Sequence, residues 1–136
     1  MSWVLDTCVL LDVGRDDRSF GSKSCCLTKE KLRQGLVVCL VTFVELAPAL
    51  SRRIFALEDF LFQLGVDHQE DWLAKDTSSA CEARSRYVQS RQEHQVAKRP
   101  IADVLIGAFA LRFQGLLTGN TDDYRKLFLS LQLISP

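Results

Sequence analysis

The sequence predicts a three-layer α/β/α sandwich built around a mostly parallel sheet. Strand-like apolar segments alternate with segments of helical periodicity along the chain, and this order is typical of parallel sheets covered by helices. The run LVVCLV at residues 36–41 is continuously apolar and rich in β-branched residues, as expected for a strand buried on both faces. Ligands of such folds bind beyond the carboxyl ends of the strands, so the residues that follow each strand are the candidates for function.

The individual elements follow from the same patterns. Strands are predicted at residues 3–5, 36–41, 65–67, 115–118 and 131–134. Helices are predicted at 27–32, 42–50, 52–63, 69–92 with a break near Asp76, and 101–113, and a short helix opens at 120–121. Pro100 suits the first turn of the helix that begins at residue 101. There is no repeat or Pro-rich linker, so residues 1–136 are expected to form a single domain.

The composition narrows the class of protein. The chain is 47% hydrophobic and 25% charged, which allows a sizeable core, and its 17 basic and 17 acidic residues leave no net charge to indicate a nucleic-acid ligand. The five cysteines form no CxxC pair and are accompanied by only two histidines, which argues against zinc. No secretory signal or membrane-spanning run is visible, so a cytoplasmic protein with free thiols is expected.

Acidic side chains follow the predicted strands, and each has a local explanation. Thr42 to Glu45 matches a capping box. Asn120 can cap a helix whose first turn carries Asp122 and Asp123. Asp6 can begin a turn. Asp103 can complement the dipole of the helix in whose first turn it lies.

Taken together, the acids point to a cation. They belong to separate elements whose ends converge on one edge of the sheet, where gathered carboxylates repel one another unless a cation is present. An oxygen-only ligand set without His or Cys suits Mg²⁺ or Mn²⁺. Local capping does not explain why the acids share one edge.

Four segments, in order, resemble the motifs of PIN-domain ribonucleases, and the whole chain resembles the VapC-like toxins of type II toxin–antitoxin pairs. The segments are LDTCVLLD at residues 5–12, VTFVEL at 41–46, RPIADVLIGA at 99–108 and LTGNTDDY at 117–124. Two positions depart from the pattern. Tyr124 stands where Phe is commoner, and Cys8 stands where Asn often follows the Thr.

The resemblance implies a divalent-metal-dependent endoribonuclease that leaves 5′-phosphate and 3′-hydroxyl ends. It implies that the catalytic acids are Asp6, Glu45, Asp103 and Asp123, that Asp6, Asp103 and Asp123 hold one or two Mg²⁺ or Mn²⁺ ions, and that the supporting polar residues are Thr7, Thr118, Asn120 and Asp122. It further implies a PIN-like fold, a small antitoxin partner and a homodimer. Residues 43–50 and 54–64 could line a groove for a partner helix or belong to the core.

RNA would have to be held by basic side chains around the acidic centre. Arg91, Lys98 and Arg99 are the main candidates, because Lys98 and Arg99 adjoin the Asp103 motif. Further basic residues that could join this rim are Lys75, Arg84, Arg86, Arg125 and Lys126. Arg84, Arg86 and Arg91 could equally form the solvated face of an amphipathic helix.

Three other classes of protein fit the sequence less well. A non-catalytic PIN-like interaction module would tolerate loss of the acids, yet all four are present. A haloacid-dehalogenase-like phosphatase needs a second Asp two positions after Asp6, where Cys8 stands. A nucleotide-binding module needs a Gly-rich phosphate loop, whereas the seven glycines are scattered.

Overall fold

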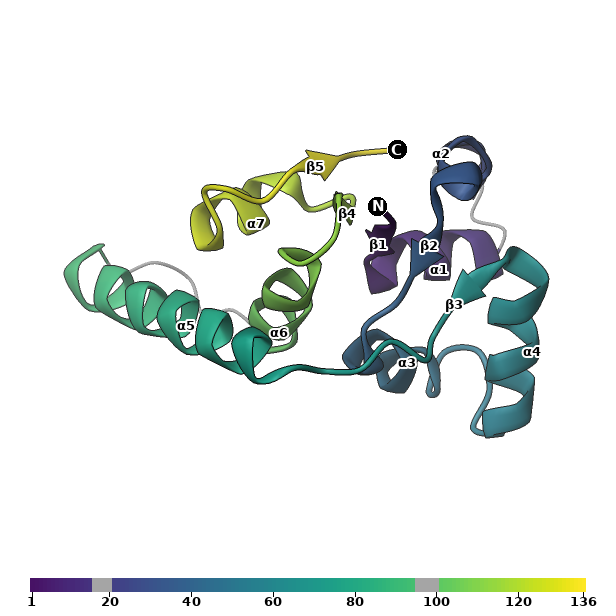
Figure 1. The fold of residues 1–136 in the computed structure, drawn as a ribbon, viewed down its shortest axis with the longest axis horizontal. Helices are drawn as coiled ribbons and strands as arrows, with labels where there is room; N and C mark the ends of the chain where they lie inside the picture. Colours follow the sequence, from purple (N-terminus) through teal and green to yellow (C-terminus); the bar gives the residue numbers. More distant parts are fainter. Residues whose placement is uncertain (16–20, 95–100) are drawn as a thin grey trace.

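The protein is built on a five-stranded sheet in which every strand pair is parallel (Figure 1). The structure, a computed structural model, describes residues 1–15, 21–94 and 101–136. The strand order is β3-β2-β1-β4-β5, so the central strand β1 lies between β2 and β4. The strands are β1 (Trp3–Leu5), β2 (Leu36–Val37), β3 (Val66–Asp67), β4 (Gly115–Leu117) and β5 (Leu133–Ile134).

Helices cover both faces of the sheet, and this confirms the predicted three-layer architecture. One layer holds α5 (Ala74–His94), α6 (Ile101–Ala110) and α7 (Thr121–Leu127); the other elements are α1 (Thr7–Gly14), α2 (Gly21–Lys31), a short 3₁₀ turn (Leu32–Gln34), α3 (Leu40–Leu46) and α4 (Ile54–Leu64). In Figure 1 the helices α5, α6 and α7 lie on one side of β1 and β4, and α1 to α4 lie on the other.

The alternation of side chains along β1 divides the core into two clusters. Val4 packs with Phe109 and other residues of the α5–α7 layer, whereas Trp3 and Leu5 pack with residues of α1, α3 and α4 such as Leu61. This division follows from the two-residue period of a strand. Both faces of the sheet are therefore buried, as the continuous apolar runs predicted.

The predicted strand at 36–41 was too long. The strand ends at Val37, and α3 begins at Leu40 with Cys39 as its N-cap residue. The apolar run extends past the strand because Val38 and Cys39, which connect β2 to α3, are also buried. Periodicity alone cannot separate a buried strand from a buried helix start.

The predicted break in the long helix near Asp76 was also wrong. Helix α5 starts only at Ala74, and Asp76 accepts a hydrogen bond from the Leu73 backbone N–H at 2.9 Å. The carboxylate of Asp76 is 1% exposed and forms an ion pair of 2.7 Å with Arg112. Asp76 therefore ties the start of α5 to the end of α6 instead of interrupting a helix.

Candidate active site at the carboxyl edge of the sheet

Asp6 lies directly after the central strand and is held by both carboxylate oxygens. Its Oδ1 accepts the Thr7 backbone N–H at 2.8 Å, which caps α1, and its Oδ2 accepts the Thr118 hydroxyl at 2.7 Å. Thr118 follows β4, the neighbour of β1, and is fully buried. Asp6 is itself only 4% exposed. Its carboxylate is therefore fixed in one orientation at the sheet edge.

Glu45 reaches the same edge from α3, the helix that follows β2. The Thr7 hydroxyl donates a hydrogen bond of 2.6 Å to Glu45 Oε1, and so links the start of α1 to α3. The alternative that Glu45 completes a capping box with Thr42 is wrong, because the N-cap residue of α3 is Cys39. Glu45 instead stands in the last turn of α3, where the helix dipole disfavours a negative charge. Local helix chemistry thus does not account for this acid.

Asp103 occupies the first turn of α6, as predicted, and is half-buried. Its Oδ1 accepts a hydrogen bond of 3.4 Å from the Tyr124 hydroxyl. Burial, the largest cause, and the charges of Asp6, Glu45 and Asp123 together raise the pKa of Asp103 to about 6, while the Tyr124 hydrogen bond opposes the shift. The four predicted acids therefore act on one another through space.

The two acids of α7 differ in their surroundings. Asp122 is 88% exposed and pairs with Arg125 at 3.5 Å, whereas Asp123 is partly buried and its charge acts on Asp103. Residues 119–123 line a small hollow of about 170 Å³. Asn120 stands at the N-cap position of α7, but its side chain makes no capping bond; its backbone N–H donates to Thr118 Oγ1 at 3.0 Å.

Cys8 is a neutral neighbour of Asp6. Its Sγ donates to Asp6 Oδ2 at 3.5 Å and accepts the Gly119 backbone N–H at 3.4 Å. Burial and the Asp6 charge raise the pKa of the thiol to about 11. Cys8 is therefore protonated near neutral pH and is not poised as a thiolate ligand.

The donor set at this edge suits a hard divalent cation in its chemistry. Asp6, Asp103, Asp123 and Glu45 supply only carboxylate oxygens. Within residues 1–15, 21–94 and 101–136, however, no three carboxylate, imidazole or thiol groups lie close enough together to form a ready-made ion site. The side chains fit a cation by type and by mutual repulsion, and their spacing is wider than that of a preassembled site.

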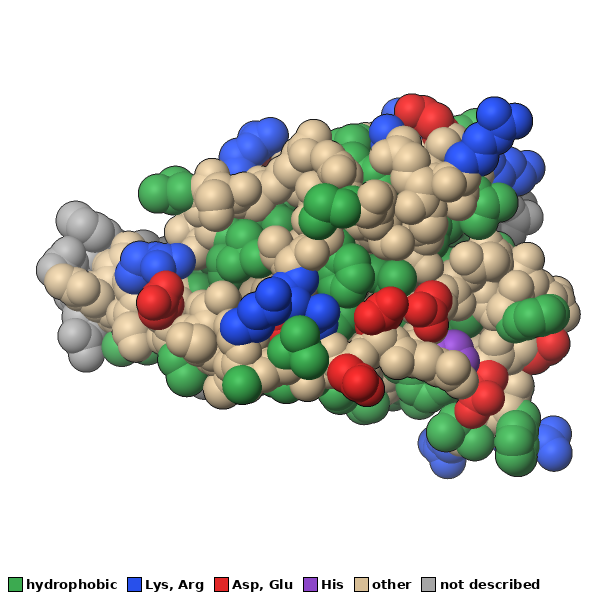
Figure 2. All heavy atoms as spheres, viewed as in Figure 1, with side chains coloured by type: hydrophobic (Ala, Val, Ile, Leu, Met, Phe, Trp, Pro, Cys, Tyr) green, Lys and Arg blue, Asp and Glu red, His purple; other side chains and the backbone are tan. Residues whose placement is uncertain are grey.

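The predicted RNA-binding residues fall largely outside this description. Lys98 and Arg99 lie outside the described residues, and the side chain of Arg91 is likewise not described. Arg86 donates a hydrogen bond of 2.9 Å to the Leu127 carbonyl, so it anchors α5 to the end of α7. On the face seen in Figure 2, basic and acidic side chains are interspersed, in keeping with the zero net charge.

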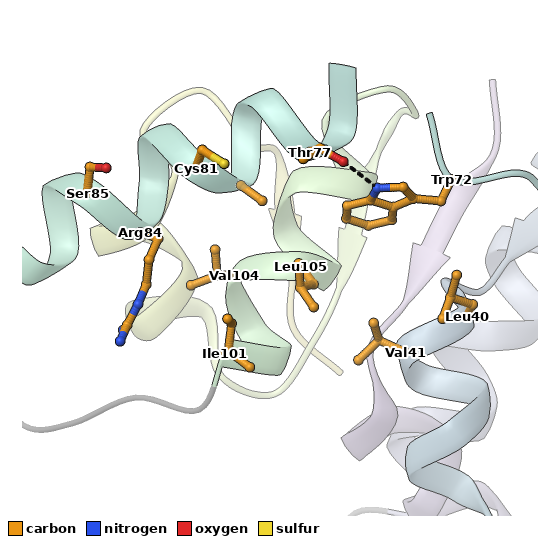
Figure 3. A pocket seen from close by; sticks show the side chains of 11 residues that line it. Leu40, Val41, Trp72, Thr77, Cys81, Arg84, Ser85, Ile101, Val104 and Leu105 are labelled. Atoms are coloured by element: carbon orange, nitrogen blue, oxygen red, sulfur yellow. Dashed lines mark hydrogen bonds between the residues drawn. The ribbon is translucent and has the colours of Figure 1, made fainter. Parts of the chain in front are cut away.

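A groove next to the acidic edge is largely apolar. It lies between α5, α6 and the start of α3 and has a volume of about 550 Å³. Figure 3 shows Leu40 and Val41 on one side, Ile101, Val104 and Leu105 of α6, and Trp72, whose indole N–H donates to the Thr77 hydroxyl at 2.8 Å.

A second apolar surface lies on α3 and α4. Of the residues that could line a partner groove or belong to the core, Leu46, Leu57 and Leu61 are core. Large side chains of the same helices are exposed: Val44, Ile54, Phe55 and Phe62, the two phenylalanines at 81% each. These segments are therefore core in part, and a partner for their exposed side chains stays a prediction. No described helix is long and apolar enough to cross a membrane.

The all-parallel sheet between two helical layers is an α/β fold consistent with the PIN-like architecture that the sequence motifs predicted. The chain is similar to a solved structure described as VapBC2 from Rickettsia felis bound to a DNA fragment from their promoter. The likeness covers 99% of this chain and 98% of that chain, with a TM-score of 0.67 and 19% sequence identity. No protein-family model and no curated protein matches the chain. The structural likeness establishes the fold.

Proposed function

We propose that this chain is a divalent-metal-dependent endoribonuclease and the toxin of a cytoplasmic toxin–antitoxin pair. The observation that supports the proposal is that the charges of Asp6, Glu45 and Asp123, each from a different element, act on the half-buried carboxyl group of Asp103. Asp6, Glu45, Asp103 and Asp123 come from segments far apart in the chain, and three of them raise the pKa of Asp103. Without a cation, repulsion between these carboxylates destabilises the folded state. A bound cation offsets that repulsion and can activate a water molecule for hydrolysis.

In this proposal Asp6, Asp103 and Asp123 hold one or two Mg²⁺ or Mn²⁺ ions. When bound, such an ion lowers the pKa of a water molecule and offsets the charge that builds up on a phosphodiester. Thr7 and Thr118 orient Asp6, and the hydroxyl of Thr7 also holds Glu45 near the reacting water. Hydrolysis would leave 5′-phosphate and 3′-hydroxyl ends. The RNA backbone would be held by Arg91, Lys98 and Arg99.

The test is cleavage of total RNA by the purified chain with manganese, followed by mapping of the new ends. We expect cleavage that disappears in excess chelator and falls at least 100-fold in Asp6→Asn, Glu45→Gln and Asp103→Asn, on the scale of groups that act directly in catalysis. Asp59→Asn is the matched control, because Asp59 is an exposed residue of α4 that bonds to Gln63. Undiminished cleavage by metal-free protein would refute the mechanism.

One observation favours a second candidate, a PIN-like interaction module without catalytic activity: the acids form no preassembled ion site. A manganese titration followed by thermal melting separates the two. A nuclease binds the ion in its folded state and is stabilised by it, by about 2.7 kcal/mol when the free ion is at 100 times its Kd. A pure interaction module melts at the same temperature throughout.

The expected antitoxin would cover the exposed apolar side chains of α3 and α4. Phe55 and Phe62 lie seven residues apart on α4 and share one face. Replacing both with Ser should weaken inhibition by the cognate antitoxin and leave RNA cleavage by the free chain unchanged. Homodimerisation, the other partner expected, is measured by light scattering of the purified chain.

A further inference from the structure

The apolar groove beside α5 is built on one face of that helix. The α5 residues that line it, at positions 77, 80, 81, 84 and 85, follow the three- and four-residue spacing of a single helical face. The other walls are apolar side chains of α6 and of the start of α3 (Figure 3). Two of them, Leu40 and Ile101, are 54% and 60% exposed, so a bound ligand would cover apolar surface that now faces solvent.

Arg84 brings a positive charge into these apolar surroundings. It is the only charged side chain among the described lining residues, and Figure 3 shows it extending from α5 on the side where Ile101 and Val104 lie. Its guanidinium carbon is 5.4 Å from the centre of the Tyr87 ring, a contact that holds the group in place. Within the part of the chain that the structure describes, its buried nitrogen Nη1 has no hydrogen-bond partner. A buried charged donor without an acceptor is unfavourable, so an acceptor supplied by a ligand would stabilise this position.

We propose that the groove binds a small molecule that has an apolar body and one carboxylate, and that Arg84 pairs with the carboxylate. Carboxylates accept strong, charge-assisted hydrogen bonds from guanidinium groups. The volume of about 550 Å³ lies within the range of small-molecule sites, which is about 300–1,000 Å³. Such sites combine a mostly apolar lining with a few polar groups that fix the orientation of the ligand. This site is separate from the acidic edge and does not depend on the proposed nuclease function.

The lining suits a carboxylate better than a nucleotide. A nucleobase has several polar atoms along its edge, and burying them without partners is unfavourable. Besides Arg84, the described lining residues with polar side-chain atoms are Trp72, Thr77, Cys81 and Ser85. The Thr77 hydroxyl already accepts the Trp72 indole N–H at 2.8 Å. A phosphate monoester carries a charge of about −1.5 to −2 at pH 7, more than one guanidinium neutralises. One carboxylate matches the single charge of Arg84.

The experiment compares octanoate with octanol, which has the same carbon chain but no charge. Binding to the ¹⁵N-labelled full chain is followed by NMR at pH 7. We expect octanoate to shift the indole N–H signal of Trp72, which lines the groove, and to leave that of Trp3 in place, because Trp3 is buried in the other core cluster. Octanol should bind at least about 10-fold more weakly, on the scale of hydrogen bonds to charged groups.

A variant and a chemical probe check the same contact. Arg84→Met removes the charge and keeps an unbranched apolar side chain, so it should bind octanoate as weakly as octanol. Arg52→Met is the matched control, because Arg52 is exposed and lies outside the groove, and it should keep the wild-type preference. Cys81 and Cys26 are both exposed, but Cys81 lines this groove and Cys26 does not. Octanoate should therefore slow alkylation of Cys81 by iodoacetamide and leave that of Cys26 unchanged.

The outcomes decide the proposal without reference to RNA cleavage. Equal Kd values of the wild type for octanoate and octanol would refute the role of Arg84, and binding of neither compound would refute the site. A Trp72 signal that changes on dilution of the protein, and not with octanoate, would show that a second copy of the chain occupies the groove and would overturn the proposal. If Arg84→Met does not fold, the comparison of the two compounds in the wild type decides, because it needs no variant.

Discussion

Asp103→Asn distinguishes a repelled ion-binding acid from an acid that merely complements a helix dipole. The substitution keeps the side-chain shape, removes one charge from the acidic edge, and leaves an oxygen that can accept the Tyr124 hydroxyl. In chelator, relief of repulsion by Asp6, Glu45 and Asp123 should stabilise the variant. Loss of a first-turn charge alone would instead cost about 0.3–1 kcal/mol.

The magnitude follows from the pKa of Asp103. A shift from 3.8 to about 6 sets a ceiling of about 3 kcal/mol on the cost of ionising this residue in the folded state. Asp103 is half-exposed, so solvent screening reduces the expected gain to about 1 kcal/mol, or a rise of about 4 °C in Tm for a chain of this size. When manganese is added, the wild type should gain stability and the variant much less.

The pH dependence has a definite sign. Because the folded-state pKa of Asp103 lies above the ordinary value, the folded protein keeps a proton that the unfolded chain releases between about pH 4 and 6. Stability of the wild type is therefore lost as the pH rises through this interval. The variant should be the more stable protein above pH 6, and its advantage should vanish near pH 4.

The measurement is a set of melting curves at pH 4, 6 and 8, each with chelator and with manganese. The curves at pH 6 and 8 test the predicted difference in Tm, and those at pH 4 give the baseline at which the two proteins should agree. Asp122→Asn is the reference for a first-turn acid in chelator, because Asp122 is almost fully exposed. The reasoning is refuted if Asp103→Asn is destabilised in chelator at pH 8 and responds to manganese as the wild type does.

Further predictions concern the acid at the end of α3 and two packing sites. Glu45→Gln should abolish most RNA cleavage while leaving Tm unchanged or slightly higher, since the charge opposes the dipole at the C-terminal end of its helix. Gly107→Ala should cost about 1–3 kcal/mol in denaturant unfolding, because an added methyl group would collide with the buried ring of Phe128. Asp76→Ala should cost about 3–5 kcal/mol by leaving Arg112 without its carboxylate partner, and an unchanged midpoint would contradict this role.

Local patterns determined the order of the elements and the positions of the acids. The apolar segments at 3–5 and 115–118 became neighbouring strands, and Asp6 and Asp123 follow them as expected. Such predictions succeed because burial of apolar side chains with a fixed period is a property of each segment by itself.

The same patterns failed where a local feature had two explanations. Thr42 and Glu45 have the spacing of a capping box, but α3 begins two residues before Thr42. A helix break was predicted near Asp76 because the local sequence does not show its partner, Arg112, which lies 36 residues away. In each case the spacing was compatible with more than one backbone path, and only contacts with other elements selected between them.

Tertiary structure alone decided how the acids are held. Thr7 meets Glu45 across 38 residues, Thr118 meets Asp6 across 112, and Tyr124 meets Asp103 from a neighbouring helix. These contacts depend on the strand order, which sets β2 and β4 on either side of β1 and brings their carboxyl ends together. Hydrogen bonds between segments distant in sequence leave no periodic trace in either segment. The residue types at this edge were therefore visible in the sequence, whereas their hydrogen-bond partners were not.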